Sequence, residues 1–153
     1  MTEQYPKAFG GTVAEVGVPT LSKEDGFRPI VRPGLAVFPK TQFSMFTEEV
    51  DVYLSSLDTP RQSFILCGIE THICVQQTAL HLLEKGFQVH IVADGVSSSH
   101  RADRNTALDA LRQAGAFVTS TESVLFELMR DSTHPSFKEM SRVISTPRVD
   151  PFE

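Results

Sequence analysis

Residues 61–145 contain two kinds of hydrophobic pattern, which alternate along the chain. Short, nearly continuous apolar runs are typical of strands buried on both faces, and they are separated by longer amphipathic segments that predict helices. The expected strands are 63–69, 87–93 and 116–119. The first two expected helices are 71–84 and 101–113. A third starts at a capping box formed by Thr119 and Glu122 and runs to about Arg130. A last short helix begins at Pro135 and ends near Ile144.

This strand-helix order predicts an α/β domain. Helical crossovers of such length join parallel strands through right-handed connections. Open parallel sheets place ligand sites beyond the carboxyl ends of their strands. Three segments lie there, namely 69–74, 94–99 and 119–123.

The first part of the chain has a different composition. Residues 1–60 contain most of the proline and glycine and predict loops with one helix, roughly 46–57, whose apolar residues recur at helical spacing. We expect residues 1–153 to form a single domain, with a loop-rich part at 1–60 and a regular part at 61–145.

Composition and charge narrow the function classes. The chain has 153 residues and a net charge of −5, which argues against a nucleic-acid surface because phosphate binding needs a basic patch. The sequence shows no apolar stretch of transmembrane length and no signal peptide, which predicts a cytoplasmic protein without membrane contacts. Cys67 and Cys74 fit neither a disulfide framework nor a zinc site, and we expect no metal or cofactor.

Cys74 is the candidate nucleophile. It falls in the first turn of the helix that follows the 63–69 strand, where the helix dipole and terminal N–H groups favour a thiolate and a developing oxyanion. Cys67 lies in the middle of an apolar strand and is interpreted as a buried, inert cysteine. Considered alone, a cysteine at a helix start is more often a packing residue, and His72 alone is more often a surface residue than a catalytic base.

A set of local motifs occurs in a fixed order along the chain. The motifs are 2–7 (TEQYPK), 39–45 (PKTQFSM), 68–74 (GIETHIC), 91–95 (IVADG) with Ser97 and Ser98, 121–123 (TES) and 134–139 (HPSFKE). Together they resemble the isochorismatase-like cysteine hydrolases, and most of all the eukaryotic isochorismatase domain-containing proteins. Each motif alone is weak, whereas the ordered set covers nearly the whole chain.

The resemblance implies a Rossmann-like, three-layer αβα fold on a six-stranded parallel sheet with an Asp-Lys-Cys triad. Cys74 matches the nucleophile, and Lys40 matches the lysine that stabilises its thiolate. A cis peptide is implied at Ile69–Glu70, which would direct the Glu70 N–H, together with the Cys74 N–H, into an oxyanion hole. The side chains expected around a small-molecule substrate are Phe43, Met45, Thr71 and His72.

The triad aspartate has no counterpart in the sequence. In the family it ends the first strand in a stretch such as Asp-Met-Gln, and no such stretch occurs here. We therefore expect the chain to lack the family's first strand, first helix and most of its second strand. An apolar strand at 63–69 would then become an unpaired edge, which invites pairing with another chain.

Two functions follow as hypotheses. The first is a cysteine hydrolase of a small carbonyl or vinyl-ether compound, impaired by loss of the aspartate. The second is a non-catalytic, truncated form that acts through protein binding or oligomerisation at the exposed sheet edge.

Overall fold

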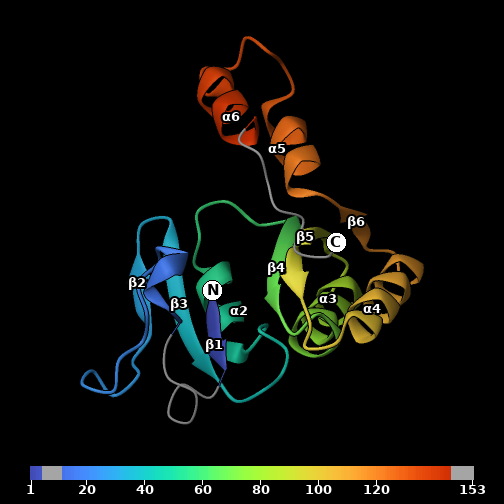
Figure 1. Ribbon diagram of the computed structural model, residues 1–153. Helices are drawn as coiled ribbons and strands as arrows, with labels where there is room; N and C mark the ends of the chain where they lie inside the picture. The colour runs from blue at the N-terminus through green and yellow to red at the C-terminus, as the bar shows by residue number, and fades with distance from the viewer. Residues whose placement is uncertain (5–11, 146–153) are drawn as a thin grey trace.

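The computed structural model describes residues 1–4 and 12–145 (Figure 1). Its strands are β1 (Thr2–Gln4), β2 (Ile30–Arg32), β3 (Leu35–Lys40), β4 (Ser63–Ile69), β5 (Gln88–Ser97) and β6 (Phe117–Thr119). Its helical elements are the short η1 (Ala14–Val16), α2 (Glu48–Ser55), the wide turn η2 (Thr71–Val75), α3 (Gln76–Glu84), α4 (Arg101–Gln113), α5 (Thr121–Met129) and α6 (Phe137–Ile144).

The regular part of the chain forms a parallel sheet in the order β4-β5-β6. This confirms the predicted strands, the helices between them and the α/β class. The strand β5 is longer than the apolar run predicted, because it continues through the expected turn to Ser97 and pairs there with Ile69 after an irregularity between Leu66 and Gly68. Buried Arg104 supports this extension by donating from Nε to the Val96 carbonyl oxygen at 3.1 Å.

The loop-rich part contains a second sheet that the sequence reasoning did not predict. Strand β3 pairs with β1 in parallel and with β2 in antiparallel fashion. The short strands and Pro39 within β3 explain why no strand pattern stood out. The one predicted helix is present as α2, where the Thr47 side chain accepts a hydrogen bond from the Val50 N–H at 3.3 Å and so caps the first turn.

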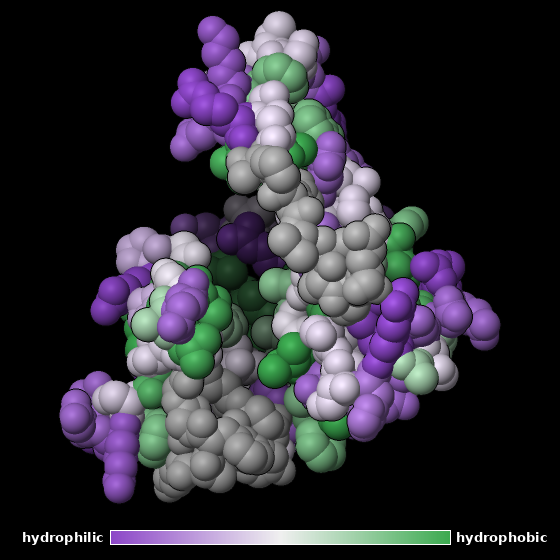
Figure 2. Space-filling model, viewed as in Figure 1, coloured by the Kyte–Doolittle hydropathy of each residue, from purple (hydrophilic) through white to green (hydrophobic). Residues whose placement is uncertain are grey.

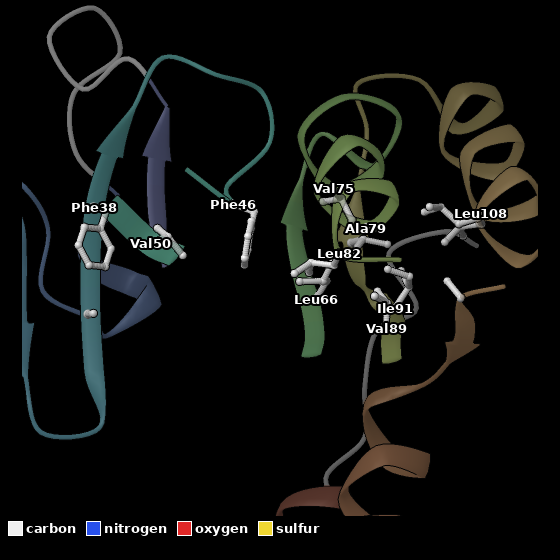
Figure 3. Close-up of a cluster of buried hydrophobic side chains, with 14 residues drawn as sticks. Phe38, Phe46, Val50, Leu66, Val75, Ala79, Leu82, Val89, Ile91 and Leu108 are labelled. Atoms are coloured by element: carbon white, nitrogen blue, oxygen red, sulfur yellow. The ribbon is translucent and has the colours of Figure 1, made fainter. Parts of the chain in front are cut away.

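The described residues therefore form two three-stranded sheets instead of the single six-stranded parallel sheet that the resemblance implied. Among these residues β1 pairs only with β3, and β4 pairs only with β5. The arrows of β1 and β4 point in the same direction in Figures 1 and 3. No strand pairs with the outer edge of β4 within the described residues.

One hydrophobic cluster joins the two sheets. It includes Phe38 of β3 and Leu66 of β4, with Phe46 between the two groups of strands in Figure 3. The Phe46 ring lies 6.1 Å from that of Phe87 and 5.1 Å from that of His81, centroid to centroid. The helix α3 closes the same core through Leu82, which is 1% exposed.

The strand β4 is not buried on both faces, contrary to the expectation from its apolar run. Leu66 is buried, whereas Ile65 is 47% and Ile69 67% exposed. Cys67, predicted to be buried and inert, is also exposed. Within residues 1–4 and 12–145 no strand pairs with the outer edge of β4, so a strand with a core-type sequence has side chains in contact with solvent.

The two C-terminal helices project away from the sheets in Figure 1. The N-cap of α5 is Ser120, whose hydroxyl oxygen accepts from the Ser123 N–H at 3.2 Å, so the predicted pairing of Thr119 with Glu122 is displaced by one residue. Helix α6 has no buried residue, and it contacts α5 through the rings of Phe126 and Phe137, whose centroids are 6.4 Å apart.

Replacing Phe46 by Ala tests whether the two sheets share one core. Because Phe46 is 5% exposed and contacts aromatic rings across the junction, we expect Phe46→Ala to lower the free energy of unfolding by about 3–5 kcal/mol. Denaturant unfolding followed by circular dichroism measures this loss. The control is Phe126→Ala, 40% exposed, with a loss of about 1 kcal/mol or less; equal losses would contradict the shared core.

Candidate active site

Lys40 and Cys74 meet where the carboxyl ends of β3 and β4 lie on the same edge of the structure. The Lys40 Nζ lies 3.8 Å from the Cys74 Sγ. It also donates to the carbonyl oxygens of Gln42 at 2.8 Å and Phe43 at 2.9 Å. These contacts provide acceptors for its N–H groups. The family resemblance implied that Lys40 and Cys74 share one site, and the structure brings the two residues, 34 positions apart, together.

Burial dominates the electrostatics of Lys40, which is only 7% exposed. Loss of hydration lowers the pKa of its amino group, and the charge and hydrogen bond of Cys74 partly oppose that effect. Burial leaves the ammonium poorly solvated, and the carbonyl oxygens of Gln42 and Phe43 and the Cys74 sulfur are among its polar contacts.

Cys74 is presented by the turn between β4 and α3. The Ile69–Glu70 peptide bond is cis, as the resemblance implied. The Val75 N–H donates to the Glu70 carbonyl oxygen at 3.2 Å, a wider span than in an α-helix, and this opens the turn η2. Cys74 is partly exposed within that turn.

A single hydroxyl group ties Cys74 to the loop after β3. The Thr78 Oγ1 donates to the Cys74 carbonyl oxygen at 2.6 Å and accepts from the Met45 N–H at 2.9 Å. Thr78 is 2% exposed. Nearby, the Ser44 Oγ lies 3.3 Å from the His81 Nδ1. Loop 41–47 is thus fixed to α3, and the loop in turn supplies the carbonyl groups that hold Lys40.

The other side of the turn is held by the end of β5 and the loop that follows it. Thr71 is completely buried, and its Oγ1 donates to the Ser97 carbonyl oxygen at 2.9 Å. The His72 Nδ1 lies 3.0 Å from the Ser98 Oγ. These contacts connect two of the three segments expected at the carboxyl ends of the strands.

The Glu70 carboxylate is already engaged in this loop. Its Oε2 accepts from the Ser99 N–H at 2.7 Å and the Ser99 Oγ at 3.1 Å, and it lies 3.9 Å from the His72 Nδ1. Glu70 therefore fixes the turn beneath Cys74 through its side chain, while the role proposed for its backbone N–H remains a prediction.

The predicted pocket residues have different positions. Phe43 is 46% exposed, and its carbonyl oxygen contacts Lys40. Met45 is partly buried against the core, and His72 is partly exposed at the rim of the turn. Thr71 supports the turn from within. The sequence reasoning missed Thr78, although its position four residues after Cys74 places both on one face of a helix.

Residues 1–4 and 12–145 contain no group of three or more His, Cys, Asp or Glu side chains arranged to hold a metal ion. Within the same ranges, no helix has the length and apolar character needed to cross a membrane.

Comparison with known proteins defines the class. The sequence pattern of the isochorismatase domain matches residues 12–123. Isochorismatase domain-containing protein 2 of Xenopus laevis is 45% identical over 150 residues, covering 98% of this chain and 66% of that protein. Its Danio rerio counterpart is 46% identical, covering 98% of this chain and 68% of its own length. This chain belongs to the isochorismatase family.

Solved structures agree with this assignment. The structure of MAR1 ribonuclease from Caenorhabditis elegans superposes with a TM-score of 0.78 at 37% identity and covers 99% of this chain and 72% of its own. A hypothetical protein from Trypanosoma cruzi gives 0.76 at 30% identity, with 99% and 71% covered. The chain spans about two thirds of the length of the curated relatives it matches.

Replacing Thr78 by Val tests the link between the nucleophile's turn and the lysine's loop. Thr78→Val removes the donor to Cys74 and the acceptor for Met45 while keeping the shape, so we expect a loss of about 1–3 kcal/mol in unfolding free energy and faster amide exchange at Met45. Thr78→Ser keeps the hydroxyl and serves as the control. Unchanged exchange at Met45 in the valine variant would show that the link does not hold the loop.

Proposed function

We propose that this chain is a cysteine hydrolase acting on a small carbonyl or vinyl-ether compound, with Cys74 as the nucleophile. The observation that supports this proposal is the 3.8 Å approach of the buried Lys40 ammonium to the Cys74 sulfur. A thiolate is the reactive form of cysteine, and an adjacent cation in a poorly hydrated position favours it. Membership of the isochorismatase family supports the same reaction class.

The first step forms a covalent adduct. For a carbonyl substrate, the Cys74 sulfur attacks the carbonyl carbon and the electron pair of the carbon–oxygen double bond moves to oxygen. The return of that pair expels the leaving group, which takes a proton from solvent, and leaves a thioester on Cys74. The backbone N–H groups of Glu70 and Cys74 are the proposed donors to this oxygen. The cis Ile69–Glu70 peptide and the wide turn that follows it support this proposal. Phe43, Met45 and His72 are the proposed contacts of the substrate.

The second step, attack of water, needs a proton acceptor. The nearest carboxylate along the chain, Glu70, is bound to Ser99. We propose that Glu70, held by these hydrogen bonds, positions the turn and does not act as that acceptor.

Thiol labelling tests the nucleophile with an internal control. Cys67 is more exposed than Cys74, so accessibility alone predicts faster alkylation of Cys67. If Lys40 stabilises the Cys74 thiolate, iodoacetamide alkylates Cys74 faster than Cys67 at neutral pH. Mass spectrometry of the digested protein gives both rates.

Variants at position 40 test whether the alkylation rate of Cys74 depends on the positive charge of Lys40. Lys40→Met should slow the alkylation of Cys74 by about tenfold, because roughly 1.4 kcal/mol of thiolate stabilisation is lost, and should leave the rate at Cys67 unchanged. Lys40→Arg keeps a cation as the matched variant. Slower alkylation of Cys74 than of Cys67 in the unmodified chain would overturn the proposed nucleophile.

A binding function is the second candidate, supported by the open edge of β4, where Ile65 and Ile69 are exposed. An exposed apolar edge favours pairing with another chain. Light scattering over a range of concentrations tests the simplest case, in which two copies associate. We expect the mass to rise with concentration if copies pair, whereas a constant monomer mass would exclude self-association through this edge.

The name ribonuclease belongs to the Caenorhabditis elegans protein. For this chain, the net charge of −5 favours a small substrate over a phosphate backbone, which is bound through clustered Lys and Arg. We therefore keep the small-molecule hydrolase as the proposed function.

A further inference from the structure

Helix α4 carries a charged residue on its buried face. Its buried residues recur at positions i, i+3, i+4 and i+7 and so form one stripe, namely Arg104, Ala107, Leu108 and Leu111. Hydrophilic side chains gather over this helix at the right of Figure 2, whereas Arg104 is only 9% exposed. A guanidinium group in such a position is stable only where acceptors meet its N–H groups. The partners of Arg104 therefore indicate which part of the structure it holds.

The strand β5 contains a bulge beside the candidate active site. Ile91 pairs with Leu66, and Val96 pairs with Gly68. Residues 92–95 of β5 therefore lie opposite a single residue of β4, and we call these four residues the bulge. A bulge bends its strand and is over-represented next to active sites, where it changes the direction of a side chain. Because the ladder with β4 does not fix four residues against one, contacts from elsewhere set their conformation.

Arg104 provides such contacts. Its Nε donates to the Val96 carbonyl oxygen at 3.1 Å, and its Nη2 donates to the Ala93 carbonyl oxygen. One of these acceptors lies within the bulge and the other directly after it, so a single side chain holds the bulge at both positions. Inside the bulge, Gly95 lets the backbone approach β4, because a Cβ atom there would lie 3.3 Å from the Cβ of Cys67.

The residues after the bulge hold the turn that presents Cys74. Each of residues 97–99 forms a hydrogen bond with one residue of 70–72, in the pairs Ser97–Thr71, Ser98–His72 and Ser99–Glu70. The Val75 N–H closes the same turn on the Glu70 carbonyl oxygen at 3.2 Å, with Cys74 inside it. A slip of one residue turns every side chain of a strand to the other face. The register that the bulge imposes therefore decides whether residues 97–99 reach their partners.

We propose that Arg104 is a positioning residue of the candidate active site, which holds the bulge of β5 in the register that places Cys74 beside Lys40. The inference rests on the proposed function, since it gives Arg104 a part in the reactivity of Cys74. Arg104 acts through the backbone of β5 and the hydrogen bonds of the turn. Its planar guanidinium group presents several donors in a fixed arrangement, which suits two separate carbonyl acceptors better than an ammonium group does. The alternative is that Arg104 contributes only to the stability of the fold.

The pH dependence of Cys74 alkylation separates positioning from stability. Iodoacetamide labelling followed by mass spectrometry of the digested protein gives the rate at Cys74 over a range of pH. Arg104→Met removes the donors to the bulge and keeps an apolar stem. We expect the midpoint of the pH profile to rise by about one pH unit, which lowers the rate at neutral pH by about tenfold. Arg104→Lys keeps a cation with N–H donors and should restore part of the difference.

The matched control is Leu111→Ala. Leu111 lies in the same buried stripe of α4 and is 0% exposed, so its truncation opens a cavity and destabilises the fold without removing a donor to the bulge. The midpoint for Cys74 should stay unchanged in this variant. An unchanged midpoint in Arg104→Met, or an equal rise in both variants, would overturn the proposal. Arg104→Gln, which keeps one amide group as a donor, replaces Arg104→Met if that variant does not fold, and a smaller rise is then expected.

Amide exchange tests the clamp without Cys74 chemistry. In Arg104→Met, exchange should become faster at Val75, whose N–H closes the turn on Glu70, and should be unchanged at Phe87, which lies at the opposite end of β5. Unchanged exchange at Val75, or equal acceleration at both positions, would contradict the clamp. A midpoint near pH 8.5 in the unmodified chain, as for a free cysteine, would contradict the proposed nucleophile alone, and the exchange at Val75 would then decide whether Arg104 holds the turn.

Discussion

The approach of the Lys40 ammonium to the Cys74 sulfur is the interaction on which the candidate site depends. Lys40 is nearly buried, and an ammonium in such a position is stable only with acceptors around it. Two backbone carbonyl oxygens and the sulfur provide them. The same contacts place a cation beside the sulfur of the proposed nucleophile.

This contact joins two halves of the molecule that do not share a sheet within the described residues. Lys40 ends β3, whereas Cys74 follows β4, and their relative position is set by Phe46 in the common core and by the Thr78 hydroxyl between the two loops. The site can therefore form without direct pairing of β1 with β4.

The regular part of the fold could be predicted because its periodicity is strong. Strand β4 and helix α4 have the bounds that were expected. The small strands β1 and β2 could not be found, since three residues carry too little pattern to distinguish a strand from a loop. The exposure of Cys67 was also mispredicted, because an apolar run indicates what a strand would bury and not whether a neighbour is present to bury it.

Cys74, the proposed nucleophile, could be singled out from the sequence by its place at a strand-to-helix turn, and Lys40 only through the family resemblance. A lysine in a loop-rich segment has no periodic signal, and its burial depends on the carbonyl groups of residues 42 and 43. Thr78 and Ser99 were missed because their roles lie in hydrogen bonds to the backbone and to Glu70, which residue type alone does not specify.

The most direct test of the Lys40–Cys74 pair is the ultraviolet absorbance of thiolate as a function of pH, measured in a Cys67→Ala background. We expect a thiolate signal at neutral pH that is present with Lys40, is absent with Lys40→Met, and disappears with Cys74→Ser. A signal that develops only near pH 8.5, as for a free cysteine, whether or not Lys40 is present, would contradict it.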